Sequence, residues 1–313
     1  MLLTVNRATT MLLSPLLDLF PRGHHRWVMG LRRAESLTEY FADQDPTGAV
    51  RQQRAAWFAQ HPELYFAAQI DLGDPLCAAL CEEMQTLARE TGRDVAPIAV
   101  ADVSGSQSPS DSTISHPLPS HALQSYAALW EPDLVWMAPD AAGRYRLIAG
   151  CVCFPSSWAV TEKLGLTMAD IHAPVPGLNA ALERQIDTFL TQLRPQEIWR
   201  RDNWNLASDD ELNHHPSRPQ IPWATEFQPS QVTIRFEHQL LLRLPRSGVI
   251  LFGIRIALLP LPELLKSPPA CERWATLIET MSPAAAAYKN LLPIRAPLLD
   301  CLRSTNDPCR TSG

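Results

Sequence analysis

Two long apolar runs in the second half of the chain place the strongest limit on its fold. One reads V-T-I-R-F-E-H-Q-L-L-L-R-L (232–244) and the other reads G-V-I-L-F-G-I-R-I-A-L-L (248–259). Both are rich in the β-branched and large apolar residues that strands favour, and Pro245 and Gly248 mark a tight turn between them. We therefore predict an antiparallel hairpin, which requires this part of the chain to belong to a sheet.

Other segments extend this sheet and cover it with helices. A second hairpin is predicted from D-L-V-W-M (133–137) and Y-R-L-I-A-G-C-V-C-F (145–154), which flank a turn with Pro, Asp and Gly. Apolar residues recur every three or four positions over 75–90 and 178–193, as in amphipathic helices. Further helices are expected over 156–166, capped by Ser156 or Ser157, and over 270–292, divided at Ser282 and Pro283. The predicted fold class is α+β, an antiparallel sheet with flanking helices.

The whole chain, 1–313, is expected to form a single domain, because no clean linker divides it. A polar stretch near 104–120 has too few apolar residues to order itself by burial, so a mobile loop is predicted there. A polar, proline-rich insert is predicted near 208–229. The 28 prolines against 13 glycines indicate a chain with many fixed turns.

Composition excludes several classes of protein. A net charge of −6 argues against binding of nucleic acid or an anionic membrane surface, which both require clustered Lys and Arg. The seven cysteines match no zinc-module spacing, and nothing in their pattern indicates disulfides. No stretch approaches the roughly 20 apolar residues of a membrane-spanning helix, and the opening segment lacks the pattern of a signal peptide. We expect a soluble, cytoplasmic protein.

The common nucleotide and catalytic motifs G-x-G-x-x-G, G-x-x-x-x-G-K-[ST], G-x-S-x-G and H-E-x-x-H do not occur in the sequence. His172, in D-I-H-A-P-V-P-G, is instead a candidate functional residue. Pro174 and Pro176 fix the backbone beside it, so the histidine is held in place. It is either a structural residue hydrogen-bonded to the backbone or a ligand to a metal or haem iron.

Charged residues interrupt the first of the two long strands. Glu237 shares one face of that strand with Arg235 and Gln239, and Arg255 is expected to project from the partner strand. A carboxylate among guanidinium groups can stay ionised in a partly buried pocket. The alternative is a solvated sheet face. For Arg201, in R-D-N-W, the alternatives are a functional role and an ordinary packing or surface contact.

Taken together, segments spread over roughly residues 25–290 resemble the haem-dependent oxidative N-demethylase family. In order they are M-G-L-R (29–32), W-E-P-D-L-V-W-M (130–137), C-F-P-S-S-W-x-x-x-E-K-L-G (153–165), I-H-A-P-V-P-G (171–177), R-x-N-W (201–204) and R-F-E-H-Q-x-L-x-R-L-P-R-S-G-x-I-L-F-x-I-R (235–255).

The resemblance implies a PAS-like fold that encloses b-type haem, with a histidine as axial ligand to the iron. His172 matches that ligand because it lies within a family-like motif, whereas His238 stands where the family more often has arginine. Within the same motifs, Trp204, Arg235 and Arg255 are expected to bind the cofactor. Phe236 and Phe252 are expected to add apolar walls.

Members of this family remove a methyl group oxidatively from a secondary amine such as dimethylamine and release formaldehyde, a monooxygenase-type reaction with dioxygen. Arg201 and Glu237 match the family's catalytic Arg and Glu near the distal side of the haem. An alkylammonium substrate is cationic, so Glu237 is expected to hold it or to accept its proton, with Arg201 keeping the carboxylate charged.

The sequence has no NADPH or flavin fingerprint and no ferredoxin cysteine spacing. In the family, a separate flavin and iron-sulfur reductase subunit delivers electrons from NADPH, and a folate-binding subunit can take the formaldehyde. Pro132, between Glu131 and Asp133, and His238 depart from the family pattern, which leaves the substrate open. Two alternatives to the enzyme are a PAS-like sensor of haem or a small ligand and a haem-free protein that retains only the scaffold.

Overall fold

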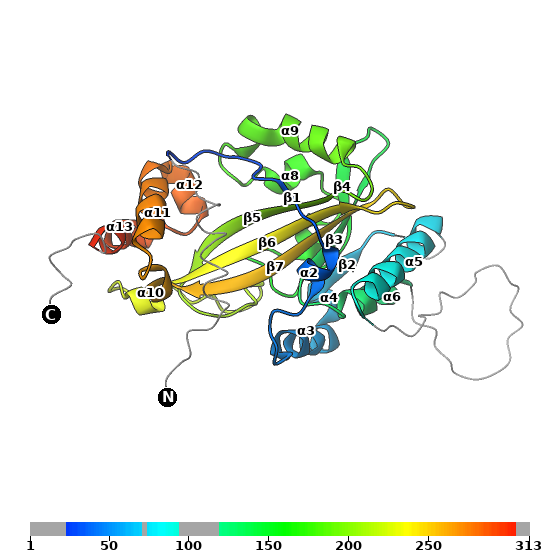
Figure 1. Ribbon diagram of the computed structural model, residues 1–313, viewed down its shortest axis with the longest axis horizontal. Helices are drawn as coiled ribbons and strands as arrows, with labels where there is room; N and C mark the ends of the chain where they lie inside the picture. Colours follow the sequence, from blue (N-terminus) through cyan, green and yellow to red (C-terminus); the bar gives the residue numbers. More distant parts are fainter. Residues whose placement is uncertain (1–22, 71–73, 94–118, 305–313) are drawn as a thin grey trace, which may run out of the picture.

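The computed structural model describes residues 23–70, 74–93 and 119–304 (Figure 1). Its centre is a seven-stranded sheet in the order β1-β5-β6-β7-β3-β4-β2, in which every neighbouring pair is antiparallel. The strands are β1 Arg32–Arg33, β2 Phe66–Ala68, β3 Asp133–Pro139, β4 Tyr145–Cys151, β5 Ile198–Ala207, β6 Thr233–Arg243 and β7 Ile250–Pro260. The predicted α+β class is confirmed. A PAS-like core is compatible with this sheet and stays a prediction.

Both predicted hairpins are confirmed. β3 pairs with β4, and β6 pairs with β7 over their full lengths, from Thr233 opposite Pro260 to Arg243 opposite Ile250. Gly248 has φ 70°, a left-handed conformation that glycine adopts at little cost and that the turn before β7 requires.

Helices cover both faces of the sheet. Their bounds are α2 Leu37–Phe41, α3 Ala49–Gln60, α4 Pro62–Tyr65, α5 Pro75–Glu90, α6 Pro119–Ala127, α7 Val160–Lys163, α8 Met168–His172, α9 Leu178–Gln192, α10 Leu261–Leu264, α11 Pro268–Thr280, α12 Pro283–Tyr288 and α13 Arg295–Ser304. The helices predicted over 75–90, 178–193 and 270–292 are confirmed.

The helix predicted over 156–166 is shorter than expected, and its predicted cap is wrong. Only Val160–Lys163 is helical, and the residue before it is Ala159. Ser157 has φ 64°, in the left-handed region, and Ser156 forms a bridge with His214. Both serines are therefore held by the tertiary structure and do not start the helix.

The two faces of the sheet bury different partners. Leu134, Trp136 and Leu240 on one face pack against residues of α2, α3, α5 and α6. Farther along the same face, Phe236 packs against α11 and α13. Figure 1 shows these two groups of helices at opposite ends of the sheet, while α8 and α9 lie over the other face.

A buried ion pair ties the first of these helical groups to the sheet. Arg54 of α3 and Asp133 of β3 are 0% and 1% exposed, and they form a salt bridge. Asp133 also accepts the backbone N–H groups of Cys153 at 2.7 Å and Phe154 at 2.9 Å, and Arg54 donates to the Cys151 carbonyl at 3.2 Å. The pair thus fixes the place where the chain leaves β4.

The predicted mobile loop near 104–120 lies outside the described residues, except for Pro119 and Ser120, which begin α6. The predicted polar insert near 208–229 is described. Asn213 and His215 within it are buried, and Asn213 Nδ2 donates to the Tyr65 hydroxyl at 2.9 Å. The insert is therefore anchored to the rest of the molecule. The single-domain organisation stays a prediction.

In the described part of the chain, each helix is too short or too polar to cross a bilayer. The six described cysteines carry free thiols.

Asp133→Asn is expected to lower the free energy of unfolding by about 3 kcal/mol, because it leaves the Arg54 guanidinium buried without its counter-charge. Urea unfolding measures the change. Glu82→Gln is the matched control, because the Glu82–Arg246 pair is 63% and 66% exposed and its loss is expected to cost less than about 1 kcal/mol. Equal effects of the two substitutions would contradict this account of the buried pair.

Candidate functional site

A cavity of about 530 Å³ lies on the sheet face that α8 and α9 cover. Volumes of roughly 300–1,000 Å³ are typical of small-molecule and cofactor sites. Strands β5, β6, β7, β3 and β4 form its floor, and α8, α9, the insert and the N-terminal segment around Trp27 form its walls. Trp27 Nε1 donates to the Pro176 carbonyl at 2.9 Å, which fastens the N-terminal segment to the start of α9.

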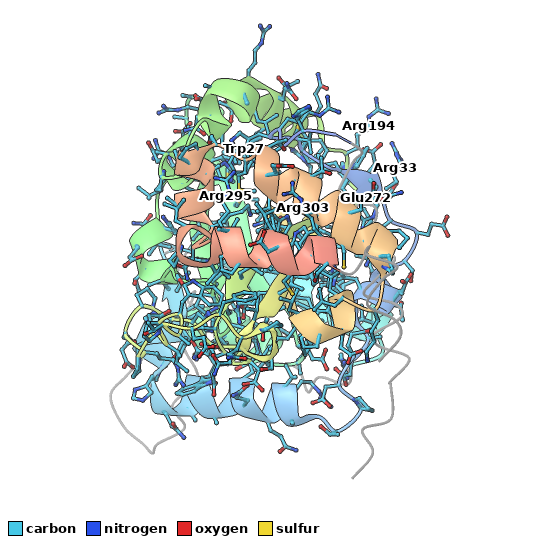
Figure 2. The ribbon with its side chains drawn as sticks, turned by 90° about the vertical axis from the view of Figure 1, so that its left-hand side faces the viewer. Trp27, Arg33, Arg194, Glu272, Arg295 and Arg303 are labelled. Atoms are coloured by element: carbon cyan, nitrogen blue, oxygen red, sulfur yellow. The ribbon has the colours of Figure 1, made fainter. Side chains whose placement is uncertain are left out.

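Figure 2 views the molecule from the end at which α11, α12 and α13 lie, and labels Trp27. Just before it, the His25 backbone N–H donates to Thr280 Oγ1 at 2.8 Å at the end of α11. The N-terminal segment therefore connects the C-terminal helices to the wall of the cavity.

One end of the cavity is apolar. Its floor and walls are formed by Val135, Met137, Leu147, Leu241, Phe252 and Ile254 from the strands and by Met168, Ile171, Leu178, Leu182, Ile186 and Phe189 from the two covering helices. These strand residues share one face because Leu241 pairs with Phe252 and Val135 pairs with Phe252 from the other side. This end suits an apolar group.

The other end of the floor is polar and is built by two strands. In β5 the cavity-lining residues Arg201, Asn203 and Asn205 alternate with residues on the opposite face. Glu237 and Gln239 of β6 lie opposite Asn203 and Arg201 in the pairing register. The prediction that Glu237 and Gln239 share a face is therefore confirmed, and Arg201 joins them.

Hydrogen bonds hold the Glu237 side chain in place. Its Oε2 accepts from Gln239 Nε2 at 2.8 Å and from Asn203 Nδ2 at 3.2 Å. Among the described residues, Glu237 forms no salt bridge, although its charge acts on Arg201, Arg235 and Lys289, and its hydrogen bonds all reach Oε2 and not Oε1. Glu237 thus presents one oriented oxygen that is available to a ligand.

Several polar atoms around the cavity lack a hydrogen-bond partner within the described chain. They are Ser156 Oγ, His172 Nδ1, Arg201 Nε, Asn205 Oδ1, Arg235 Nε and Gln239 Oε1. Buried polar groups in folded proteins are nearly always paired, so a concentration of unpaired ones indicates a site that receives polar groups of a ligand or water. Burial lowers the pKa of Arg201, and the carboxylates of Glu237 and Asp202 act in the opposite direction.

His172 is the last residue of α8 and lines the cavity. The helix begins with a cap in which Thr167 and Asp170 bond to each other's backbone N–H groups, and the Val175 N–H donates to the His172 carbonyl at 2.9 Å just after the helix. Burial lowers the pKa of His172 to about 4, and the charges of Arg201 and Lys163 add to the lowering. The imidazole is therefore neutral at pH 7.

Two other histidines near the sheet have carboxylate partners. His214 lines the cavity too, but its Nε2 lies 2.7 Å from Asp209 Oδ1. His238 lies on the opposite face of β6, where its Nδ1 is 2.6 Å from Asp202 Oδ1. Within the described chain, His172 has a buried Nδ1 without a partner. The buried His215 of the insert has an unpaired Nε2 as well, but it does not line the cavity.

The expected position of Arg255 in this site is wrong. Arg255 lies opposite His238 in the β6–β7 register, so its side chain projects to the face away from Glu237. There it forms an ion pair with Glu131 and donates to the Ala42 carbonyl at 2.9 Å. Arg255 thus stabilises the packing of the first helices against the sheet and does not line the cavity.

The expected positions of Trp204 and Phe236 are also wrong, for the same reason. Both alternate with cavity-lining residues on their strands and therefore face the C-terminal helices. The ring centroid of Trp204 is 5.5 Å from that of Trp274 in α11. Phe252, on the cavity face of β7, does line the cavity as expected.

Arg235 lines the cavity but its guanidinium is largely committed. It is 1% exposed, and it donates to the carbonyls of Leu212, at 3.0 Å, and Glu211. Arg235 therefore holds the insert against the sheet, with only its Nε unpaired.

Two residues of the polar end were missed by sequence reasoning. Asn203 carried a usable signal, because it is two positions from Arg201 and must share its face. Lys289, which follows α12, carried none. Its Nζ donates to the Trp204 carbonyl at 2.6 Å and approaches Asn203 Oδ1 at 3.4 Å, contacts across 85 and 86 residues of sequence.

Comparison with protein families gives a match over most of the chain. Residues 38–299 match the family described as haem-dependent oxidative N-demethylase, alpha subunit-like. The matched range contains β2 to β7 and every residue of the polar end described above.

The haem-free chain is expected to lose stability as the pH falls from 6.5 to 4. In this range unfolded His172 binds a proton and folded His172 does not, so the unfolded state is favoured by up to about 3 kcal/mol at the acid end. Urea unfolding at a series of pH values measures this loss. His172→Gln cannot titrate, so its free energy of unfolding is expected to depend less steeply on pH. Equal slopes of this free energy against pH for the two proteins would contradict the lowered pKa of His172.

Proposed function

The chain belongs to the haem-dependent oxidative N-demethylase alpha subunit-like family, and we propose that it binds haem b through His172 and demethylates a small secondary amine. The observation that carries the proposal is a neutral imidazole with an unpaired nitrogen in the same cavity as Glu237 and Arg201. Dimethylamine is the simplest substrate of this class, and formaldehyde is the expected product.

The residues of the cavity fit haem. One neutral histidine is sufficient as the protein ligand of a haem iron, and the apolar end offers a surface against which a porphyrin can pack. When bound, the haem supplies the redox and oxygen chemistry, and the protein supplies binding, orientation and electrostatics. His172 is the ligand that the cavity favours, because the other cavity-lining histidine of the described chain, His214, is paired with Asp209.

Glu237 is proposed to bind the substrate amine. Its Oε2 is held by Asn203 and Gln239, which leaves Oε1 to accept a hydrogen bond from the cationic ammonium group. The same oxygen is positioned to take up the ammonium proton, since a general base must lie within hydrogen-bond reach of the proton it removes. Arg201 adds positive charge near the carboxylate and has a donor free for a ligand.

Electrons are proposed to come from NADPH through a separate flavin and iron-sulfur reductase, with dioxygen as the oxidant. The description "alpha subunit-like" supports an enzyme with further subunits, and a folate-binding subunit that takes formaldehyde is part of the proposal. A cytoplasmic location is also proposed, since the free thiols of the described cysteines are typical of a reducing compartment.

Reconstitution of the purified chain with haem is expected to give a Soret band that is shifted or lost in His172→Ala, because that variant removes the proposed axial ligand. His61→Ala is the matched control, since His61 is exposed and lies outside the cavity. An identical spectrum for wild type and His172→Ala would refute the ligand assignment.

Glu237→Gln is expected to reduce kcat/KM for formaldehyde release by about 100-fold or more while leaving the Soret band in place. The assay supplies dioxygen, a reductase and a methylated amine, and Glu226→Gln, an exposed glutamate, serves as control. A haem-loaded wild-type chain that binds amines without releasing formaldehyde would instead favour the ligand sensor over the enzyme.

A further inference from the structure

The lining of the cavity carries an excess of positive charge. The ionisable lining residues of the described chain, apart from histidine and tyrosine, are Lys163, Arg201, Arg235 and Lys289 on the basic side and Asp209 and Glu237 on the acidic side. Of the two carboxylates, that of Asp209 is already engaged by His214 at 2.7 Å. Cations removed from water are unfavourable unless an anion pairs with them, so the charge balance calls for an anionic ligand group.

Lys289 has a donor left for such a group. It follows α12, which Figure 1 shows near the end of the sheet, and it is 4% exposed while lining the cavity. Its ammonium has three N–H donors. Two of them bond to the Trp204 carbonyl and to Asn203 Oδ1, and the ammonium also lies 4.5 Å from the centroid of the Trp204 ring, which leaves one N–H without a hydrogen-bond acceptor in the described chain. Burial lowers its pKa to about 8, so the group is still mainly charged at pH 7.

Arg201 is the second cation at this end. It lies two residues before Asn203 on the same face of β5, beside the residue that Lys289 contacts. Of the charges that act on Lys289, the Glu237 carboxylate opposes the lowering of its pKa and the Arg201 charge adds to it, as expected for two cations that repel each other. Arg201 Nε also lacks a partner in the described chain. An anion that contacts both cations would replace this repulsion with attraction.

We propose that Arg201 and Lys289 together bind a carboxylate in the cavity, next to the Glu237 carboxylate that receives the amine. Resting on the function proposed above, this inference assigns the substrate to the N-methylated amino acids, of which N-methylglycine is the simplest. Asn203 lies opposite Glu237 in the strand register and contacts Lys289, so the anionic and cationic sites are adjacent. A zwitterion satisfies both sites, whereas dimethylammonium adds another positive charge.

The same carboxylate chemistry is available from the cofactor, because haem b carries two propionates. The two sources predict different effects of Lys289. If the carboxylate belongs to the substrate, substitution of Lys289 weakens the binding of N-methylglycine to the haem-free chain. If the carboxylate is a haem propionate, substitution of Lys289 weakens the binding of haem but not of haem dimethyl ester, in which both carboxylates are blocked.

Titration calorimetry of the haem-free full chain with N-methylglycine, acetate and dimethylamine tests the substrate source. N-methylglycine is expected to bind at least tenfold more tightly than dimethylamine or acetate. Lys289→Gln keeps a hydrogen-bond donor and loses the charge. It is expected to weaken the affinity for N-methylglycine at least tenfold and to leave the affinity for dimethylamine unchanged. Arg201→Gln, on a different element, is expected to cause the same loss.

Thermal unfolding verifies that each variant is folded, and Lys266→Gln is the matched control, because Lys266 is 56% exposed and paired with Glu263 at the surface. Soret titrations with haem and haem dimethyl ester test the cofactor source. If Lys289→Gln loses affinity for haem but binds haem dimethyl ester and N-methylglycine as the wild type does, the carboxylate site belongs to a haem propionate, and the assignment of the substrate to N-methylated amino acids is overturned.

The proposal is overturned when the wild type binds N-methylglycine no more tightly than dimethylamine or acetate. It is also overturned when folded Lys289→Gln and Arg201→Gln bind N-methylglycine, haem and haem dimethyl ester as the wild type does. Failure of the wild type to bind haem contradicts the proposed function instead. It leaves the calorimetric result for the haem-free chain unaffected, so the two failures are distinguishable.

Discussion

The pairing register of β5, β6 and β7 decides which side chains meet in the cavity. With Glu237 opposite Asn203 and Gln239 opposite Arg201, the polar residues of two strands share one face, and Leu241 opposite Phe252 continues that face with apolar residues. A shift by one residue would send all of them to the other face. The site therefore depends on the strand pairing before it depends on any helix or loop.

Charged side chains are paired on one side of the sheet and partly unpaired in the cavity on the other. Arg255, on the face toward the first helices, is paired with Glu131. Arg54 of α3 is paired with Asp133 at the start of β3, and backbone groups satisfy further donors and acceptors of these pairs. Such groups fix the architecture. On the cavity face, Arg201 retains an unpaired donor, and Glu237 is held by neutral amide groups without a salt bridge in the described chain. This unsatisfied polarity distinguishes a binding site from a structural network.

Local sequence patterns predicted the elements and much of the polar face, but not the register between strands. Turn residues located both hairpins, and the two-residue period placed Gln239 beside Glu237. The face to which Arg255 points depends on its cross-strand partner, which the sequence of one strand alone does not determine. Arg255 pairs with His238, the neighbour of Glu237, and therefore points to the opposite face. Lys289 could not be predicted from local sequence, because its contact with Asn203 spans 86 residues and forms only when α12 packs near β5.

A crystal structure of the haem-loaded chain would test the central claim most directly, because it locates the iron relative to the residues of the cavity. The account predicts a bond from the iron to a nitrogen of His172, with Glu237 and Arg201 facing the same enclosed space. Haem bound outside the cavity, or ligated by His214 or another residue, would contradict it.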